Sequence, residues 1–268
     1  MSDRVIAAAI PPTVLVFAPR ERTRTLARDT FPRRRWRLIV RRGVDEFSRT
    51  FREELIDAAI VDLGSAQEDN WRAAALAREF PSVPFFALTT LRGADGPVLA
   101  QCAALEFADV LVEDVDEDAI RELVLRQSYT TRFSRALETP PPSLALKTPL
   151  QMGAWQYVVQ HAGRPVRTAA LALALGVTRE HLSRTFAAEG APNLKRIIDL
   201  VRLIGAAELA KNPGYDVRDV AHILGFASSS HLSSTAKRIA STRPASLARL
   251  RTIDLIDRFN RGHARSRG

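Results

Sequence analysis

The sequence predicts an α/β domain built around a parallel sheet, followed by an all-α domain with two helix-turn-helix motifs. Strand-like and helix-like stretches alternate through the first 138 residues at a spacing typical of parallel sheets. From residue 150 onward the pattern is helical, and one stretch of text recurs after about fifty residues. The length of 268 residues also suits two domains.

The α/β half contains five expected strands and five expected helices. The strands are short apolar runs: Thr13–Phe17, Arg37–Val40, Ala58–Leu63, Pro84–Thr89 and Val110–Val112. The helices fill the gaps and follow the last strand: Glu21–Thr30, Val44–Leu55, Asn70–Phe80, Pro97–Phe107 and Glu117–Leu137. Strands that alternate regularly with helices in this way favour one parallel sheet covered by helices.

Five such units resemble the receiver domain of two-component response regulators, which has a flavodoxin-like fold. Ile60-Val61-Asp62 matches the end of the third strand, where receivers carry the phosphorylated aspartate. Leu88-Thr89 matches the hydroxyl residue after the fourth strand. The resemblance therefore implies a receiver site at Asp62 and Thr89.

The remaining parts of a phosphorylation site are missing from the sequence. A receiver holds Mg²⁺ with two acids after its first strand, and a Lys after its fifth strand neutralises the phosphoryl group. Here Phe17, Ala18 and Pro19 occupy the first region, and Glu113 and Asp114 occupy the second. Acids at that point would repel a phosphoryl group. We therefore expect a pseudo-receiver with a vestigial site, and a phosphorylated response regulator is the alternative.

Charged stretches of the first half indicate a use in protein contacts. Eight acids and one Arg lie between residues 106 and 122, whereas residues 20–42 contain ten Arg. This complementarity suits a homodimer through the receiver-like domain, or docking of the acidic face on a basic domain. A solvated charged face is the plainer alternative.

The clearest helix-turn-helix signal lies in residues 216–250. Asp216 can cap a helix that Gly225 ends, with Phe226 at the turn and a second helix over Ser229–Ile239. The apolar positions of the first helix fall on one face: Val217, Val220, Ala221 and Leu224.

The same pattern occurs upstream. His181-Leu182-Ser183-Arg184-Thr185 recurs as His231-Leu232-Ser233-Ser234-Thr235, which indicates two copies of one motif. Between them we expect a helix over Leu194–Ala210, capped by Asn193. A helix of that length spans roughly 25 Å and suits two recognition helices set near the roughly 34 Å spacing of successive major grooves.

From about Pro149 to Leu250 the chain resembles the DNA-binding region of the AraC/XylS family of transcription regulators, in which a linker helix joins two helix-turn-helix units. The second unit carries the family pattern most fully: Val220, Ala221, Gly225, Phe226, Ser228, Ser230, Lys237, Arg238 and Pro244. Three positions depart from it. Ala236 stands where the family usually has a buried Phe, Ser234 where it has Arg, and Ser241 where it has Gly.

The resemblance implies a DNA-facing set on the second helix of each unit. In the first unit, Arg184 can donate two hydrogen bonds to guanine and Glu180 can accept one from cytosine. The serines of the second unit can bond weakly to bases or phosphate, or form a capped turn with a solvated face. The expected set is Arg179, Glu180, Ser183, Arg184, Ser228, Ser229, Ser230, Ser233, Ser234, Lys237 and Arg238, with Arg179, Lys237 and Arg238 on phosphates.

The distribution of charge supports a nucleic-acid partner independently of the motifs. Residues 1–140 contain 20 Lys and Arg against 22 Asp and Glu, a net charge of −2. Residues 141–268 contain 19 against 8, a net charge of +11. The basic charge therefore lies wholly in the half with the helix-turn-helix repeats, as a phosphate-binding surface requires.

Other classes of function lack support. One Cys excludes a disulfide framework and a zinc cluster of several Cys, and we expect a reducing, cytoplasmic setting. Cys102 lies on an apolar helical stripe and is expected to be buried and inert. No catalytic motif, metal site, cofactor site or membrane span is expected.

These observations predict four segments: a receiver-like domain over 1–138, a Pro-rich extended linker over 139–149, the double helix-turn-helix domain over 150–257, and a disordered basic tail over 258–268. The expected function is a sequence-specific DNA-binding transcriptional regulator, with double-stranded DNA and RNA polymerase as partners. A non-specific DNA-binding or partner-binding protein is a further alternative.

Overall fold

The chain forms two compact units in a computed structural model that describes residues 10–65, 67–90, 96–113, 116–187 and 191–264. The sheet unit comprises residues 11–132 and 212–215. The helical unit comprises the described parts of 133–211 and 216–268, together with residue 10. Each unit has its own core.

The sheet unit is built on five parallel strands. They are β1 (Thr13–Phe17), β2 (Arg37–Arg41), β3 (Ala58–Asp62), β4 (Phe85–Thr89) and β5 (Asp109–Val112). Their order is β2-β1-β3-β4-β5, with register pairs such as Val16 with Ile60 and Leu88 with Leu111. This is the flavodoxin-like topology that the sequence predicts.

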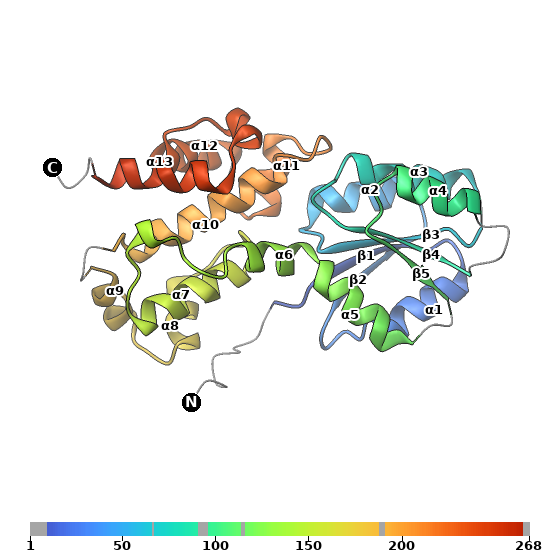
Figure 1. Cartoon of the computed structure of the whole chain (residues 1–268), viewed down its shortest axis with the longest axis horizontal. Coiled ribbons are helices and arrows are strands. Elements are labelled where there is room, and N and C mark those ends of the chain that lie inside the picture. Colours follow the sequence, from blue (N-terminus) through green and yellow to red (C-terminus); the bar gives the residue numbers. More distant parts are fainter. Residues whose placement is uncertain (1–9, 66, 91–95, 114–115, 188–190, 265–268) are drawn as a thin grey trace. The chain divides into compact units, whose positions relative to one another are not determined.

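Helices cover both faces of the sheet (Figure 1). One face carries α1 (Glu21–Thr30) and α5 (Glu117–Gln127). The other carries α2 (Val44–Glu53), α3 (Glu68–Ala75) and α4 (Gly96–Ala104), with a short 3₁₀ turn η1 (Leu76–Arg78) after α3. Because a parallel sheet is buried on both sides, its strands are continuously apolar rather than alternating.

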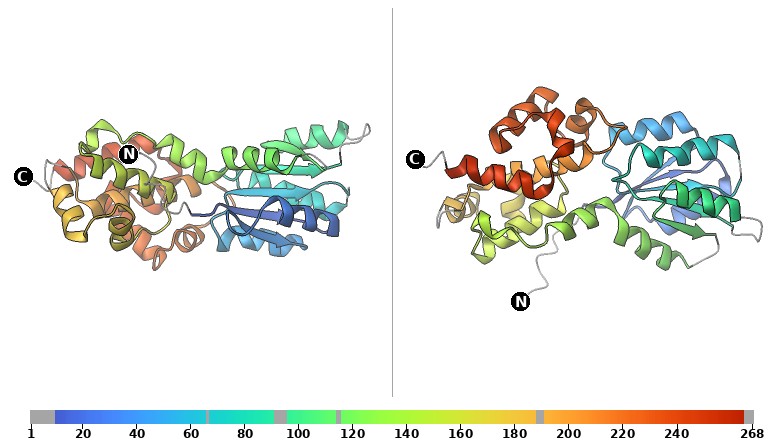
Figure 2. Two further views of the ribbon diagram at one scale, coloured as in Figure 1. Left: turned by 90° about the horizontal axis from the view of Figure 1, so that it is seen from below. Right: turned by 45° about the horizontal axis from the view of Figure 1, so that its top comes forward.

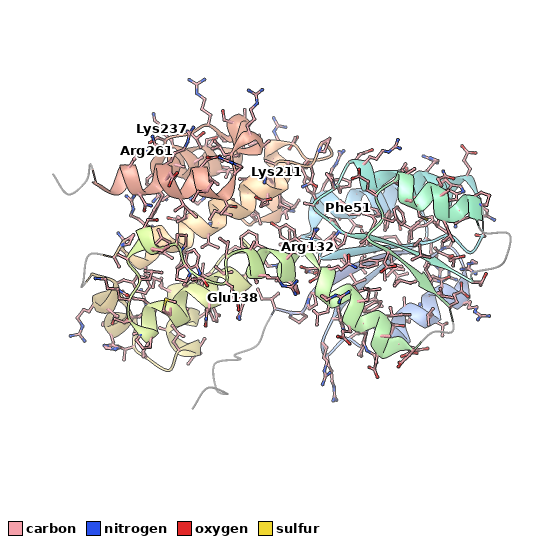
Figure 3. The ribbon with its side chains drawn as sticks, in the orientation of Figure 1. Phe51, Arg132, Glu138, Lys211, Lys237 and Arg261 are labelled. Carbon is pink, nitrogen blue, oxygen red and sulfur yellow. The ribbon has the colours of Figure 1, made fainter. Side chains whose placement is uncertain are left out.

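Alternate residues of β1 pack against the helices on opposite faces of the sheet. Val14 and Val16 face the cluster that contains Phe31 and Trp36, whose rings meet edge to face at 5.0 Å. On the other side, the ring of Phe17 lies 5.6 Å from that of Phe47. A group of stacked rings continues there, with Phe51 (Figure 3) 4.4 Å from Phe80 and 5.6 Å from Phe85.

The helix predicted over Glu117–Leu137 is interrupted. It divides at Ser128 into α5 and α6 (Tyr129–Ala136). Asp57, completely buried before β3, causes the break. Its backbone carbonyl accepts from the Tyr129 N–H at 2.8 Å, and its carboxylate accepts from the N–H of Thr130 at 3.0 Å and of Thr13 at 2.8 Å. These bonds satisfy free donors at the start of a new helix.

The helical unit has a long central helix, α10 (Leu194–Leu209), around which the other elements gather (Figure 2). Before it come η2 (Pro142–Leu144), α7 (Pro149–Gln160), α8 (Thr168–Ala174) and α9 (Arg179–Ala187). After it come α11 (Val217–Ile223), α12 (Ser229–Ala240), η3 (Pro244–Arg249) and α13 (Thr252–Ala264). Asn193 caps α10 as predicted, by accepting from the Arg196 N–H at 2.9 Å. No helix within the described ranges is long and apolar enough to cross a membrane.

The Pro-rich segment differs from the extended linker expected over 139–149. The division between the units falls earlier, between Arg132 and Phe133. Leu144 is fully buried, and the indole N–H of Trp155 donates to the Leu137 carbonyl at 2.8 Å. Buried apolar contacts therefore bind this segment to the core of the helical unit.

The basic tail predicted over 258–268 is also different. Helix α13 continues to Ala264, and Phe259 is fully buried beneath the guanidinium of Arg196, 5.0 Å from the ring centre. Phe259 supplies the apolar anchor, together with Leu255 and Ile256, that makes this helix part of the core. Residues 265–268 of that prediction, like 1–9 of the first domain, lie outside the described residues.

Candidate nucleic-acid interface

The first helix of the second helix-turn-helix begins and ends as the sequence predicts. The Asp216 carboxylate accepts from the N–H groups of Arg218 at 2.6 Å and Asp219 at 2.8 Å, and the Asp219 carboxylate accepts from the Asp216 N–H at 3.0 Å. This reciprocal capping box satisfies donors that the helix cannot satisfy itself. Gly225 then turns the chain with φ +61°, and Gly176 does the same in the first unit with φ +67°.

Helix α9 presents the first predicted reading surface. Leu182 and Phe186 are fully buried, so the helix is fixed against its neighbours. All four predicted residues of this helix lie on its exposed side: Arg179, Glu180, Ser183 and Arg184. Among the described residues, neither Arg184 nor Glu180 forms an ion pair. Both charged groups are therefore available to a ligand.

Helix α12 presents a different surface, because its serines bond to their own helix. Ser228 is the N-cap and accepts from the His231 N–H at 3.1 Å. The hydroxyls of Ser233 and Ser234 donate to the carbonyls of Ser229 at 2.9 Å and His231 at 3.0 Å. Ser230 is exposed and Ser229 half-buried. Three of the five predicted serines thus already have a partner within α12.

The two cations at the end of α12 lie in different settings. Lys237 is exposed at the surface of α12 (Figure 3). The guanidinium of Arg238 forms an ion pair with Asp199 of α10 at 2.8 Å. Arg238 therefore ties the recognition helix to the central helix, which its sequence pattern did not reveal.

Two departures from the family pattern are explained by the fold. Ala236 is fully buried, so α12 is packed at this point without a larger side chain. Ser241 ends α12 in the left-handed conformation, with φ +48°. A glycine would adopt this conformation with less strain, which accounts for its usual place there.

Arg202 of α10 is a structural residue that the sequence analysis missed. Its Nε and Nη2 donate to the Leu224 carbonyl at 3.2 and 2.9 Å, and its guanidinium stacks 3.8 Å from the ring centre of Phe226. Burial lowers the pKa of Arg202. The charge satisfies the free carbonyl end of α11 and holds the turn. The available signal was the position of Arg202 within the otherwise apolar stretch Leu200–Ala207 of α10.

The receiver-like site in the sheet unit is filled by the chain itself. Asp62 is fully buried at the end of β3. The Arg20 Nε donates to its two carboxylate oxygens at 2.9 and 2.8 Å. The Thr23 hydroxyl and the Gly64 N–H add hydrogen bonds of 2.6 and 3.0 Å. A Cβ on Gly64 would overlap the Arg20 guanidinium, so glycine leaves the space that Arg20 needs.

Glu113, at the end of β5, completes this network. It pairs with the Arg20 Nη2, and its second oxygen lies 2.9 Å from the Arg22 Nε. The hydrogen bond to Asp62 raises the pKa of Arg20 most, while partial burial opposes the rise. Thr89, also buried, lies at the end of β4 as predicted, whereas Asp114 lies outside the described residues. In this unit the cation, Arg20, follows the first strand and the acid, Glu113, follows the fifth. In a receiver the acids follow the first strand and the cation follows the fifth.

Comparison with known proteins agrees with the assignment of a helix-turn-helix region to the helical unit. Residues 171–249 match a family model described as a helix-turn-helix domain. The chain carries an AraC-type helix-turn-helix domain. The matched residues place a DNA-binding helix-turn-helix domain in the helical unit, and the strand order gives the sheet unit a receiver-like fold. A search of curated proteins found no significant match.

Solved structures with similarity to the chain have low identity. A response regulator from Thermotoga maritima is 20% identical, with 44% of this chain and 97% of that chain covered and a TM-score of 0.38. The response regulator StyR is 17% identical, with 71% and 98% covered and a TM-score of 0.40. The xylose-binding transcription activator XylR is 12% identical, with 89% and 70% covered and a TM-score of 0.35. Because these scores are below 0.5, the receiver-like fold rests on the strand order.

Proposed function

We propose that the AraC-type domain binds specific DNA sequences through its two recognition helices, set in successive major grooves, and that the first unit supplies most of the base selection. The exposed side of α9 carries this proposal, because Arg184 and Glu180 are unpaired there among the described residues. A guanidinium can make a bidentate bond to guanine, whereas a serine hydroxyl fits any base or a phosphate. Three of the five predicted serines, Ser228, Ser233 and Ser234, also form hydrogen bonds within α12.

The test compares Arg184→Ala with Lys237→Ala on the preferred DNA site and on scrambled DNA. Arg184→Ala should cost about 1 to 3 kcal/mol on the preferred site and little on scrambled DNA. Lys237→Ala should weaken both equally and make the salt dependence shallower, because an ammonium near phosphate acts mainly through counterion release. Arg126→Ala, which removes an exposed arginine of α5, is the matched control.

Equal losses for Arg184→Ala on both DNAs would contradict the assignment of base selection to the first unit. A larger change of base preference on Ser229 or Ser233 substitution would do the same. Equal wild-type affinity for all sequences would favour a non-specific DNA-binding protein instead.

We propose further that the sheet unit is a regulatory or dimerisation module that is not phosphorylated. The position of Arg20 supports this, because its guanidinium contacts the oxygens of Asp62 that a metal and a phosphoryl donor would approach. Incubation with Mg²⁺ and acetyl phosphate should leave the mass of the protein unchanged. Stoichiometric addition of one phosphoryl group, abolished by Asp62→Ala, would instead establish a phosphorylated response regulator. In this proposal the regulator acts in the cytoplasm, with a second copy of the chain and RNA polymerase as its protein partners.

A further inference from the structure

The turn between α1 and β2 presents three consecutive arginines to solvent. Arg33, Arg34 and Arg35 are all exposed. Among the described residues, none of the three side chains has a hydrogen bond or an ion pair. The next arginine differs, since Arg37 pairs with Glu54. The turn lies at the amino-terminal end of β2, whereas the receiver-like site lies at the carboxyl ends of the strands.

The fold holds this turn firmly. Phe31 and Trp36 on either side of it are buried, and their rings pack edge to face. The Pro32 carbonyl accepts from the N–H groups of Arg35 at 3.0 Å and Trp36 at 3.2 Å. In addition, the Arg121 Nη1 donates to the Thr30 carbonyl at 2.9 Å, just before the turn. The backbone is therefore fixed before any ligand binds, so binding costs less conformational entropy.

Three exposed guanidinium groups on consecutive residues concentrate positive charge on one short turn, and a bound anion would reduce their mutual repulsion. All three are Arg rather than Lys, and a planar guanidinium matches the geometry of a phosphate diester with two parallel hydrogen bonds. Charge and shape thus point to a polyanion with phosphates at regular intervals.

We propose that the Arg33–Arg35 turn is a second DNA-contacting surface, which binds the phosphate backbone beside the site bound by the helix-turn-helix domain. The inference rests on the proposed function, since DNA held by the helical unit is at high effective concentration for any surface on the same chain. The net charge of −2 over residues 1–140 means that this surface adds to binding rather than sustaining it alone.

A second copy of the chain is the competing partner, through the acidic stretch 106–122. The structure disfavours it because several of those acids are engaged. Glu113 is buried in the Arg20 network, and Glu117 and Asp118 pair with Arg121. Asp116 caps α5 by accepting from the Asp118 N–H at 2.9 Å. DNA offers free phosphates at every step and is the better match.

The test uses the full chain and two triple variants with the same loss of charge. The first is Arg33→Ala/Arg34→Ala/Arg35→Ala. The control is Arg42→Ala/Arg49→Ala/Arg126→Ala, which removes three separate exposed arginines of the same unit. Affinity is measured at several salt concentrations, on DNA trimmed to the preferred site and on DNA extended beyond it on both sides.

On extended DNA the slope of log K against log salt should fall by about 2 to 3 in the turn variant, since each phosphate contact contributes roughly 0.9. The control should change it by less than about 1, and trimmed DNA should not distinguish the variants. Equal slopes for both variants on extended DNA would overturn the proposal. Unchanged DNA binding with lost self-association, measured by sedimentation, would assign the turn to a second copy instead.

The outcome is separable from that of the proposed function. Loss of selectivity on Arg184→Ala with no effect of the turn variant would leave the proposed function standing and refute only the second surface. An effect of the turn variant with none of Arg184→Ala would refute the assignment of base selection alone. Thermal unfolding of both triple variants checks that each is folded.

Discussion

Replacement of Arg20, which directly precedes α1, by Met should destabilise the sheet unit more than any single surface substitution within α1. The change keeps an unbranched apolar stem and removes only the guanidinium. It leaves the carboxylates of Asp62 and Glu113 buried without their shared cation, with side chains 0% and 1% exposed. Asp62 then keeps only the hydrogen bonds from Thr23 and Gly64, and Glu113 keeps only its pair with the exposed Arg22. Two buried anions at the same edge of the sheet are unfavourable both for burial and for mutual repulsion.

The magnitude follows from the burial of the three groups. Removal of one partner from a buried ion pair costs about 3 to 5 kcal/mol. The Arg20 side chain is 26% exposed, so water can partly replace it, and we expect the lower end of that range, about 3 kcal/mol. For a domain of this size such a loss lowers Tm by about 10 °C.

The assay is thermal and urea unfolding of the full chain. Arg28→Met, in the helix that follows Arg20, is the control, since the Arg28 side chain is 55% exposed and its Nη1 lies 3.7 Å from the Glu21 Oε1. It should cost less than about 0.5 kcal/mol.

The reasoning would be refuted by a cost of Arg20→Met no larger than that of Arg28→Met. A triple variant, Arg20→Met with Asp62→Asn and Glu113→Gln, should recover much of the lost stability, because the buried groups are then neutral.

Further expectations concern single residues of both units. Ser241→Gly should raise the free energy of unfolding by about 0.5 to 1 kcal/mol in urea, since φ is +48°, and a decrease would contradict strain there. Gly225→Ala should lower it by at least about 1 kcal/mol, because φ is +61° and the new Cβ would lie 2.7 Å from the Pro165 Cγ. Burial lowers the pKa of His161 below its ordinary 6.5, so its folded form binds a proton less readily than the unfolded chain. The free energy of unfolding should therefore fall as pH drops below about 6.5. In His161→Gln, the change of Tm between pH 5 and 7 should be smaller than in the wild type. Burial raises the pKa of Cys102, so a disulfide reagent at pH 8 should label the native thiol far more slowly than the urea-unfolded one.

Local signals predicted most of the fold. The ends of β1 and α1 coincide with the predicted ranges, and the caps at Asn193 and Asp216 form as expected. These features depend on residues close in sequence, such as a short side-chain acceptor before an apolar periodic stretch. The break at Ser128 depends instead on Asp57, which is distant in the chain.

The site residues also divide into those that nearby sequence predicts and those that depend on contacts between distant parts of the chain. Exposure of Arg184 follows from its place on an amphipathic helix, which the repeat revealed. The role of Arg20 required the pairing of two distant strand ends, and from the sequence Glu113 seemed only to be a repulsive acid. The Phe259 anchor was within reach of sequence reasoning, since Leu255, Ile256 and Phe259 have helical spacing, but the basic residues around it obscured the pattern.

The hydrogen bonds within α12 have a consequence for how the proposed DNA preference could change. The hydroxyls of Ser233 and Ser234 donate to carbonyls of their own helix, and the buried Leu232 and Ile239 hold that helix in place. If the first unit supplies the base selection, as proposed, replacement of the exposed Ser230 by Asn or Arg would add a base preference without removing an existing one. Under that proposal the DNA sites bound would change one base pair at a time, while the contacts of the first unit stay the same.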